Sequence, residues 1–191
     1  MQDYNDISIS THLVFSKGQE FILGKEFIGR EEFSICGLHS LEQYGGSRWQ
    51  AFRAAVAHAQ FVGNDDVIVV CFEGHRFSRE YRRTELMKDV IAAAALGTQV
   101  LFGGCSDFNN LVPLNERMLW VDHVKDFNFC VVFHPVFRTI LAIRPDGRMS
   151  LEEILSENIA NKLLLSPSVT QSESEDRVSV YIQVAKKYHV I

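Results

Sequence analysis

The stretch that decides the fold runs from Val67 to Phe102 and reads VIVVCFEGHRFSREYRRTELMKDVIAAAALGTQVLF. Residues 67–72 are all apolar, which is typical of a strand covered on both faces of a sheet. A helix over 79–96 is predicted next, because this segment is charged in its first half, alanine-rich in its second, and followed by Gly97. Residues 99–102 are predicted to form the next strand. A connection of this length indicates a parallel βαβ unit with a right-handed crossover.

Residues 7–37 precede this unit and are predicted to form an antiparallel meander of short strands. Residues 7–15 alternate between apolar and polar side chains, as a half-buried strand does. Short aromatic and aliphatic runs follow, and Gly18, Gly24 and Gly29 separate them as turns or bulges would.

Two further segments carry helix start signals. Ser47 and Gln50 have the spacing of a capping box, and apolar residues then recur at helical intervals. Ser150 and Glu153 repeat that spacing before a helix predicted over 151–165. Strands are predicted in between, at 118–121, 129–133 and 137–143. The fold class is therefore a single α/β domain with a mixed sheet and about three helices.

The predicted domain covers residues 1–165. Residues 166–176 are rich in serine and acidic residues and are predicted to form a linker. Residues 177–191 contain an alternating pattern at 178–184. This pattern predicts a last strand, either of the same domain or of a segment that docks on a partner.

Composition limits the possible functions. The chain has 191 residues, of which 47% are hydrophobic and 23% charged, values typical of a globular domain. The balance of 24 acidic to 19 basic side chains disfavours a general nucleic-acid-binding protein. The polar N-terminus and the short apolar runs predict a soluble, cytoplasmic protein without a membrane span. The cysteines and histidines are scattered, so we predict reduced thiols, no metal site and no cofactor.

The carboxyl ends of the two strands in the βαβ unit carry candidate ligand-binding residues. Ligands of open α/β sheets bind beyond such strand ends. Glu73 and His75 follow the first strand, and Gly103, Gly104 and Asp107 follow the second. We expect them to flank one crevice, where the glycines allow a ligand close to the backbone.

The start of the helix predicted over 79–96 is unusually basic. Arg76, Ser78, Arg79 and Arg82 lie at this start, where free N–H groups and guanidinium groups together attract phosphate or carboxylate. Positive charge at a helix N-terminus is unfavourable unless something compensates it. Three interpretations stay open: a solvated first turn, an anion or nucleotide site, and a contact for an acidic partner protein.

Glu73, His75 and Glu85 are the candidate acid–base groups. The residues DVIVVCFEG at 66–74, Glu85 and ALGTQV at 95–100 resemble the second half of nucleoside deoxyribosyltransferase-like domains, and more loosely TIR domains. This resemblance covers the strand–helix–strand unit only. It implies that Glu85 acts on a ribosyl carbon.

Two functions from different classes follow. The first is binding of a nucleotide-like or other small anion at the strand ends, with possible N-glycosidic or hydrolytic chemistry. The second is a non-catalytic interaction module, such as an inhibitor, immunity or accessory protein. Such a module would bind its partner through an exposed strand edge or an acidic surface.

Overall fold

The computed structural model describes residues 7–172, which form one α/β domain. This part of the chain contains five α-helices: α1 (Glu20–Lys25), α2 (Arg48–His58), α3 (Arg83–Ala95), α4 (His134–Ala142) and α5 (Leu151–Asn158). A 3₁₀ turn, η1 (Leu41–Tyr44), precedes α2, and a π-helical turn, η2 (Ala59–Gly63), extends it. No helix within residues 7–172 has the length and apolar character needed to cross a membrane.

Most strands form one mixed eight-stranded sheet in the order β2-β1-β3-β10-β5-β11-β8-β7. Its members are β1 (Ile9–Phe15), β2 (Phe33–Ser40), β3 (Val67–Phe72), β5 (Val100–Phe102), β7 (Leu111–Pro113), β8 (Met118–Val121), β10 (Phe129–Phe133) and β11 (Lys162–Leu165). Two short pairs lie outside it: β4 (His75–Phe77) with β12 (Thr170–Ser172), and β6 (Asp107–Phe108) with β9 (Val124–Lys125).

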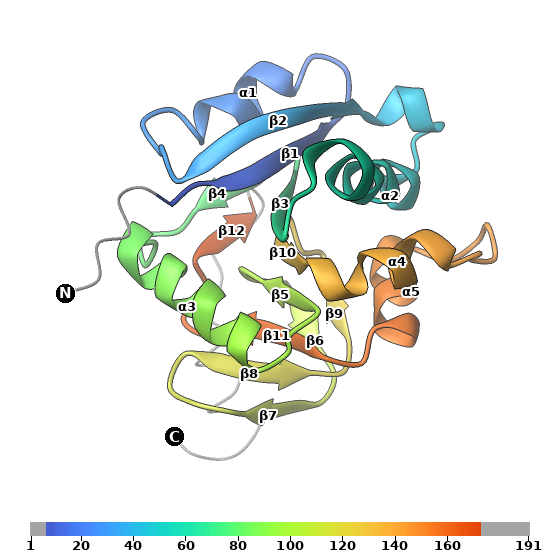
Figure 1. The fold of residues 1–191 in the computed structure, drawn as a ribbon. Coiled ribbons are helices and arrows are strands. Elements are labelled where there is room, and N and C mark those ends of the chain that lie inside the picture. The colour runs from blue at the N-terminus through green and yellow to red at the C-terminus, as the bar shows by residue number, and fades with distance from the viewer. Residues whose placement is uncertain (1–6, 173–191) are drawn as a thin grey trace.

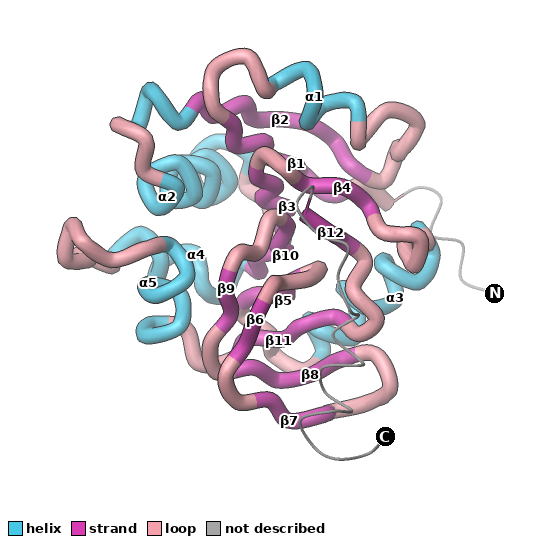
Figure 2. Tube along the Cα trace, turned by 180° about the vertical axis from the view of Figure 1, so that it is seen from behind, coloured by secondary structure: helices cyan, strands magenta, loops and turns pink. Residues whose placement is uncertain are grey.

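Helices cover both faces of the sheet, so the domain has three layers (Figures 1 and 2). Buried side chains of α2, α4 and α5 form one core with one face, and buried side chains of α1 and α3 form a second core with the other. The predicted single α/β domain with a mixed sheet is confirmed, although it has five α-helices rather than about three.

The antiparallel meander predicted for residues 7–37 is wrong. β1 and β2 pair in parallel, with Ile9 opposite Phe33, and α1 connects them. Leu23 and Phe27 are both buried and lie four residues apart. The apolar residues of this connection therefore follow the helical period instead of the alternation of a strand.

The strand–helix–strand unit exists, but its two strands do not pair. β10 lies between β3 and β5 and is antiparallel to both, so β3 and β5 still point the same way. All five residues of β10 are buried, as are those of β5. An apolar run indicates burial on both faces but carries no information on which strand lies beside it. The helix begins at Arg83 rather than at 79, and residues 75–77 before it form β4.

The predicted strands at 118–121 and 129–133 are confirmed as β8 and β10, but two later predictions are wrong. Residues 137–143 belong mainly to α4, which a proline opens at its first turn. The helix predicted over 151–165 ends at Asn158, and its last residues form β11 instead. Its predicted capping box is present, since Ser150 and Glu153 exchange hydrogen bonds.

The serine-rich segment predicted as a linker contacts the domain in its first part. Val169 is buried, and residues 170–172 pair with β4 as β12. The remainder of that segment and the strand predicted at 178–184 lie outside the described residues.

The connections around β1 define a topological switch point. From β1 the chain passes through α1 to β2 on one side, and from β2 it passes through α2 to β3 on the other side of β1. These helices lie on opposite faces of the sheet (Figure 1). In open α/β sheets with the order 2-1-3, the crevice beyond the carboxyl ends of strands 1 and 3 is where ligands bind.

Candidate functional site at the carboxyl ends of β1 and β3

A cleft of about 160 Å³ lies at this switch point. Its lining comes from the ends of β1 and β3, the turn η1, the first turn of α2 and the residue before β10: Val14, Leu41, Arg48, Phe72, Glu73 and Asn128. We call it the switch-point cleft. It combines a guanidinium, a carboxylate and an amide with an apolar floor, which is the composition of a small-ligand site.

Glu73 joins the ends of the two parallel strands. Its carboxylate accepts hydrogen bonds from the backbone N–H of Ser16, at 2.6 Å, and from Ser16 Oγ, at 3.0 Å. Its own backbone N–H donates to the carbonyl of Val14 at 2.8 Å. An ionised carboxylate has more acceptor positions than these contacts use, so Glu73 can accept a further hydrogen bond from a ligand.

Arg48 is the cationic group of the switch-point cleft and the first residue of α2. Its guanidinium donates to Glu152 Oε1 at 2.7 Å and to the carbonyl of Phe127 at 2.6 Å. The guanidinium carbon also lies 4.4 Å from the centre of the Phe72 ring, a cation–π distance. These contacts fix the side chain in place, while 32% of it stays exposed to solvent.

A second cleft, of about 280 Å³, is lined in part by the residue that forms an ion pair with Arg48. Its lining includes Glu152 and the predicted site residue Asp107. Asp107 Oδ2 lies 4.0 Å from Lys125 Nζ, and both side chains are largely exposed. Asp107 thus shares a cleft with Glu152, the residue that pairs with Arg48 of the switch-point cleft.

The largest of these clefts, about 390 Å³, lies between the start of α2 and the loop that connects α4 to α5. Trp49, Gln50, Arg53 and residues of that loop line it. No strand end contributes to its lining, so we give more weight to the smaller cleft at the switch point.

His75 is sealed inside the protein rather than presented to a ligand. It is 3% exposed and lies among aromatic rings, 4.5 Å from Phe77 and 5.4 Å from Phe129 between ring centres. Burial lowers its pKa to about 3, and the nearby Arg30 adds to the shift. Neither ring nitrogen has a hydrogen-bond partner among the described residues. His75 is thus a neutral core residue at neutral pH.

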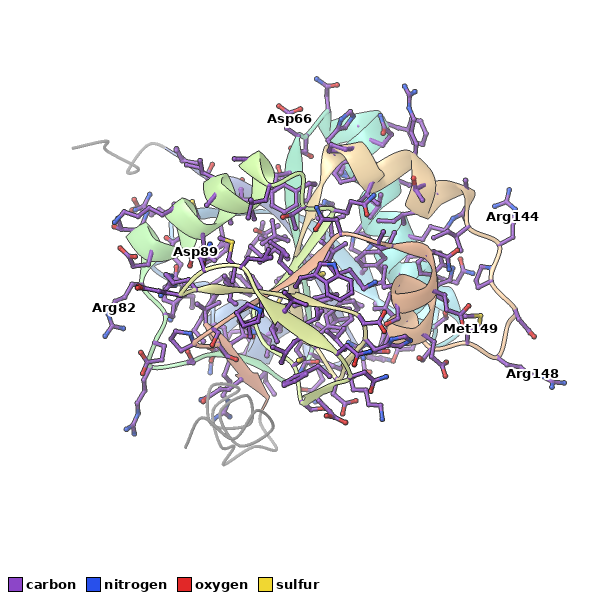
Figure 3. All side chains as sticks on the ribbon, turned by 90° about the horizontal axis from the view of Figure 1, so that it is seen from below. Asp66, Arg82, Asp89, Arg144, Arg148 and Met149 are labelled. Carbon is purple, nitrogen blue, oxygen red and sulfur yellow. The ribbon has the colours of Figure 1, made fainter. Side chains whose placement is uncertain are left out.

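The predicted residues Arg76, Arg79 and Arg82 are not among the residues that line the switch-point cleft. Arg83 Nε is 3.8 Å from the carboxylate of Glu32, the residue before β2. Arg82 donates to the carbonyl of Arg79 and points away from the domain (Figure 3). In the same view Arg82 lies on the opposite side of the molecule from Met149, which lines the 390 Å³ cleft beside α2.

Glu85 belongs to the same end of α3. It is exposed and pairs with Lys88 Nζ at 2.8 Å. The hydrogen bond from Lys88 and the charge of that residue lower the pKa of Glu85. Glu73 and Glu85 therefore belong to different elements, the first directly after β3 in the switch-point cleft and the second in the first turn of α3.

Gly103 and Gly104 allow a segment of the same chain to pack closely. A Cβ atom on Gly103 would lie 2.8 Å from the Thr170 side chain, and one on Gly104 would lie 2.8 Å from the Thr170 carbonyl oxygen. Ser78 holds this segment too, since its hydroxyl donates to the carbonyl of Ser168 at 2.7 Å. Arg76 lies opposite Gln171 in the β4–β12 pair. These four residues meet around β12.

The reasoning from sequence missed Arg48, Asn128 and a cluster of imidazoles and one thiol. His12 in β1, Cys36 in β2 and His58 at the end of α2 converge although they are distant in sequence, and His39 lies beside them. Burial, followed by the charges of His39 and His58, lowers the pKa of His12 to about 3. Partial burial and the charge of Asp65 raise the pKa of the Cys36 thiol.

Comparison with known proteins supports the fold and no more. No protein-family model matches the chain, and no curated protein matches it either. A solved structure, A197 from STIV, superposes with a TM-score of 0.53 at 12% identity, over 90% of this chain and 96% of that one. The structure of apo UDP-glucose pyrophosphorylase gives a TM-score of 0.48 at 12% identity, over 91% of this chain and 71% of that one. The first shows a shared α/β fold, and the second is too distant to support an argument.

Proposed function

We propose that the protein binds a nucleotide-like anion in the switch-point cleft. The observation that carries this proposal is the position of the cleft, beyond the carboxyl ends of β1 and β3 where the strand order reverses. Arg48 would hold a phosphate or carboxylate of the ligand, because its planar guanidinium is partly exposed and held by fixed contacts.

Glu73 would accept a hydrogen bond from a ribose or sugar hydroxyl. It is the carboxylate of this cleft, and it is the group to which we assign the acid–base role of any N-glycosidic or hydrolytic step. The arginines of residues 76–82 and Glu85 do not enter this proposal, since none of them lines the switch-point cleft.

A complete nucleotide needs more room than 160 Å³, because pockets for drug-sized ligands run to about 300 Å³ or more. The adjoining 280 Å³ cleft supplies that room if the ligand spans the Arg48–Glu152 ion pair. We therefore propose that the anionic part contacts Arg48 and that the remainder extends toward Asp107.

The test is a thermal-shift series with nucleoside phosphates, ribose 5-phosphate and inorganic phosphate. A ligand at a hundred times its Kd stabilises by about 2.7 kcal/mol, which raises the Tm by roughly 5–10 °C. Arg48→Gln should lose this shift. Arg82→Gln is the matched control and should keep it, because Arg82 is exposed and does not line the switch-point cleft. Equal loss in both variants, or no shift in the parent with any ligand, would refute the proposal.

A second function, binding of a partner protein, is favoured by the edge of the sheet. Among the strands of residues 7–172, β2 is the last on its side of the sheet, and Ile35 and Leu38 on it are 45% and 61% exposed. An open strand edge with apolar side chains can pair with a strand of another chain. Leu38→Lys should abolish any self-association or partner binding that light scattering detects in the parent. The same variant should still bind nucleotides, and loss of that binding would argue against two separate surfaces.

The cytoplasmic location expected from the sequence remains a prediction.

A further inference from the structure

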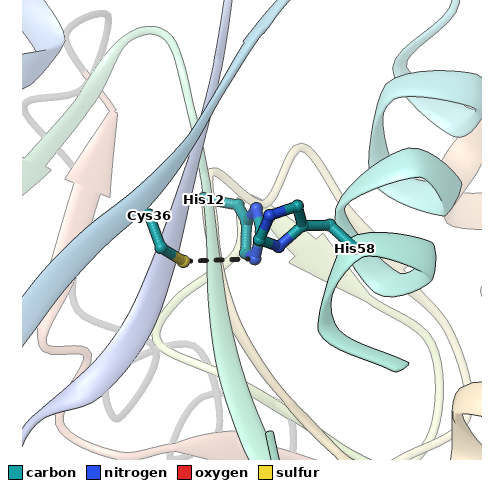
Figure 4. A group of neighbouring side chains, drawn as sticks. All are labelled: His12, Cys36 and His58. Carbon is teal, nitrogen blue, oxygen red and sulfur yellow. Dashed lines mark hydrogen bonds between the residues drawn. The ribbon is translucent and has the colours of Figure 1, made fainter. Parts of the chain in front are cut away.

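His12, Cys36 and His58 converge between the sheet and α2 (Figure 4). One ligand atom from each lies within 4.8 Å of the others, although the residues come from β1, β2 and the last turn of α2. We propose that these three side chains bind a Zn²⁺ ion, at a site separate from the switch-point cleft.

The spacing requires little movement. Tetrahedral zinc with bonds of about 2.0–2.1 Å to nitrogen and 2.3 Å to sulfur places its ligand atoms about 3.3–3.6 Å apart. His12 Nε2 and Cys36 Sγ are already 3.5 Å apart. The third ligand atom, from His58, needs to approach by about 1.5 Å at most for the same tetrahedral spacing.

A chain of hydrogen bonds through His39 already orients His12. Its Nδ1 lies 3.0 Å from His39 Nε2, and His39 Nδ1 lies 3.1 Å from the hydroxyl of Tyr44. When His12 Nδ1–H donates to His39, the lone pair of His12 Nε2 faces Cys36. Histidines that bind metals commonly donate their other N–H in this way, which fixes the tautomer and the direction of the ring.

The backbone is shaped to bring these groups together. The β1–β2 register shifts between Thr11 and His12, so that Cys36 is an extra residue in β2. Such a bulge redirects a side chain, and here the Cys36 sulfur points toward His12. Gly37 follows, and a Cβ atom there would lie 2.1 Å from His12 Nδ1. The hydrogen bond between His12 and His39 therefore depends on the absence of a side chain at position 37.

Two buried polar atoms beside the cluster have no partner among residues 7–172. One is His58 Nδ1 and the other is Asp65 Oδ2, although Asp65 Oδ1 accepts from Ser10 Oγ at 2.5 Å. Unpaired buried polar atoms are rare in native proteins and often indicate an ion or a water molecule. A zinc ion would bond to a nitrogen of His58, and a zinc-bound water could donate to Asp65.

The ligand types select the metal. Two imidazoles and one thiolate suit Zn²⁺, whereas Mg²⁺ and Ca²⁺ prefer oxygen ligands. Three protein ligands leave the fourth tetrahedral position to water, as in zinc sites that stay open to solvent. Cys36 lies on the edge strand and is exposed as a residue, so the ion could enter from that side.

The test uses the full chain, stripped with chelator and titrated with Zn²⁺ against a chromophoric competitor, and with Co²⁺ as a spectroscopic substitute. We expect one Zn²⁺ per chain and a thiolate-to-cobalt absorption band. Cys36→Ser should remove that band. His39→Phe, which removes the hydrogen-bond partner of His12 Nδ1, should weaken Zn²⁺ binding by roughly 10–100-fold. Cys36→Ser and His58→Gln should each weaken it by more.

Cys105→Ser and His134→Gln are the matched controls, because they remove a thiol and an imidazole outside the cluster. Both should bind Zn²⁺ as the parent does. Circular dichroism of the metal-free variants tests whether each is folded. Because neither Cys36 nor His58 is fully buried, either variant can serve if the other fails to fold. Absence of stoichiometric Zn²⁺ in the parent, or unchanged affinity in folded Cys36→Ser and His58→Gln, would overturn the proposal.

Discussion

Replacing His75 should make the protein less sensitive to acid. In the folded protein the pKa of His75 is about 3, because the ring is buried among aromatic side chains and lies near Arg30, whereas an unfolded chain gives about 6.5. Between these two values the unfolded state binds a proton that the folded state does not. Stability is therefore complete above the unfolded pKa and falls as the pH drops below it.

The magnitude follows from these two pKa values. At about pH 5, His75 is protonated in the unfolded chain but not in the folded protein. The free energy of unfolding is therefore about 2 kcal/mol lower than at about pH 7.5. His75→Phe removes this proton-binding difference and keeps a ring in the aromatic cluster. Since neither nitrogen of His75 has a partner among the described residues, the change breaks no hydrogen bond recorded there.

The assay is urea unfolding of the parent and of His75→Phe at both pH values. Any fixed packing cost of the larger ring cancels when each protein is compared with itself. Between about pH 7.5 and about pH 5, the free energy of unfolding should fall by about 2 kcal/mol less in His75→Phe than in the parent. The other histidines contribute equally to both proteins. Parallel losses in the two proteins would refute the reasoning and show that His75 is protonated in the native state.

Three further predictions concern stability, measured by urea unfolding. Arg117→Leu should lower the free energy of unfolding by about 3–5 kcal/mol, because Arg117 Nε donates to the buried carboxylate of Asp89 at 2.8 Å. The double variant with Asp89→Leu should lose less stability, and an equal loss would contradict the pairing. Ser150→Ala should lower the free energy of unfolding by about 1 kcal/mol, because it removes the capping box of α5. Unchanged stability would argue against that cap. Gly104→Ala should lower the free energy of unfolding by about 1–3 kcal/mol, because the added Cβ would clash with the Thr170 carbonyl oxygen. Gly147→Ala is the control and should lose less stability, since no atom lies within 4 Å of a Cβ placed there.

The candidate site was predicted only in part from sequence. Glu73 was expected at a strand end and lies in the switch-point cleft, and Asp107 lies in the adjoining cleft. Arg48 was not predicted, because its role depends on α2 crossing β1 and on the positions of Glu152 and Phe127. The only local signal was the cap at Ser47, which places residue 48 at a helix start. That signal says nothing about what the helix start faces.

The fold, like the site, was predicted only in part from sequence. Apolar runs at 67–72 and 129–133 and the two serine caps were sufficient to predict strands and helix starts, because these features depend on neighbouring residues. Residues 20–25 and 137–143 were misassigned, since a short apolar run fits the period of either element until burial selects one face.

Only the tertiary structure decided which strands and side chains meet. β10 enters between β3 and β5 from a later part of the chain, and β1 pairs in parallel with β2. These pairings bring His12, Cys36 and His58 together, and they place Glu73 beside Arg48. Contacts between residues far apart in sequence depend on how whole elements pack to bury their apolar faces, whereas caps, turns and periodicity are local. The sequence by itself therefore determined the fold class and the elements that have local signals, whereas packing determined the strand pairings and the sites.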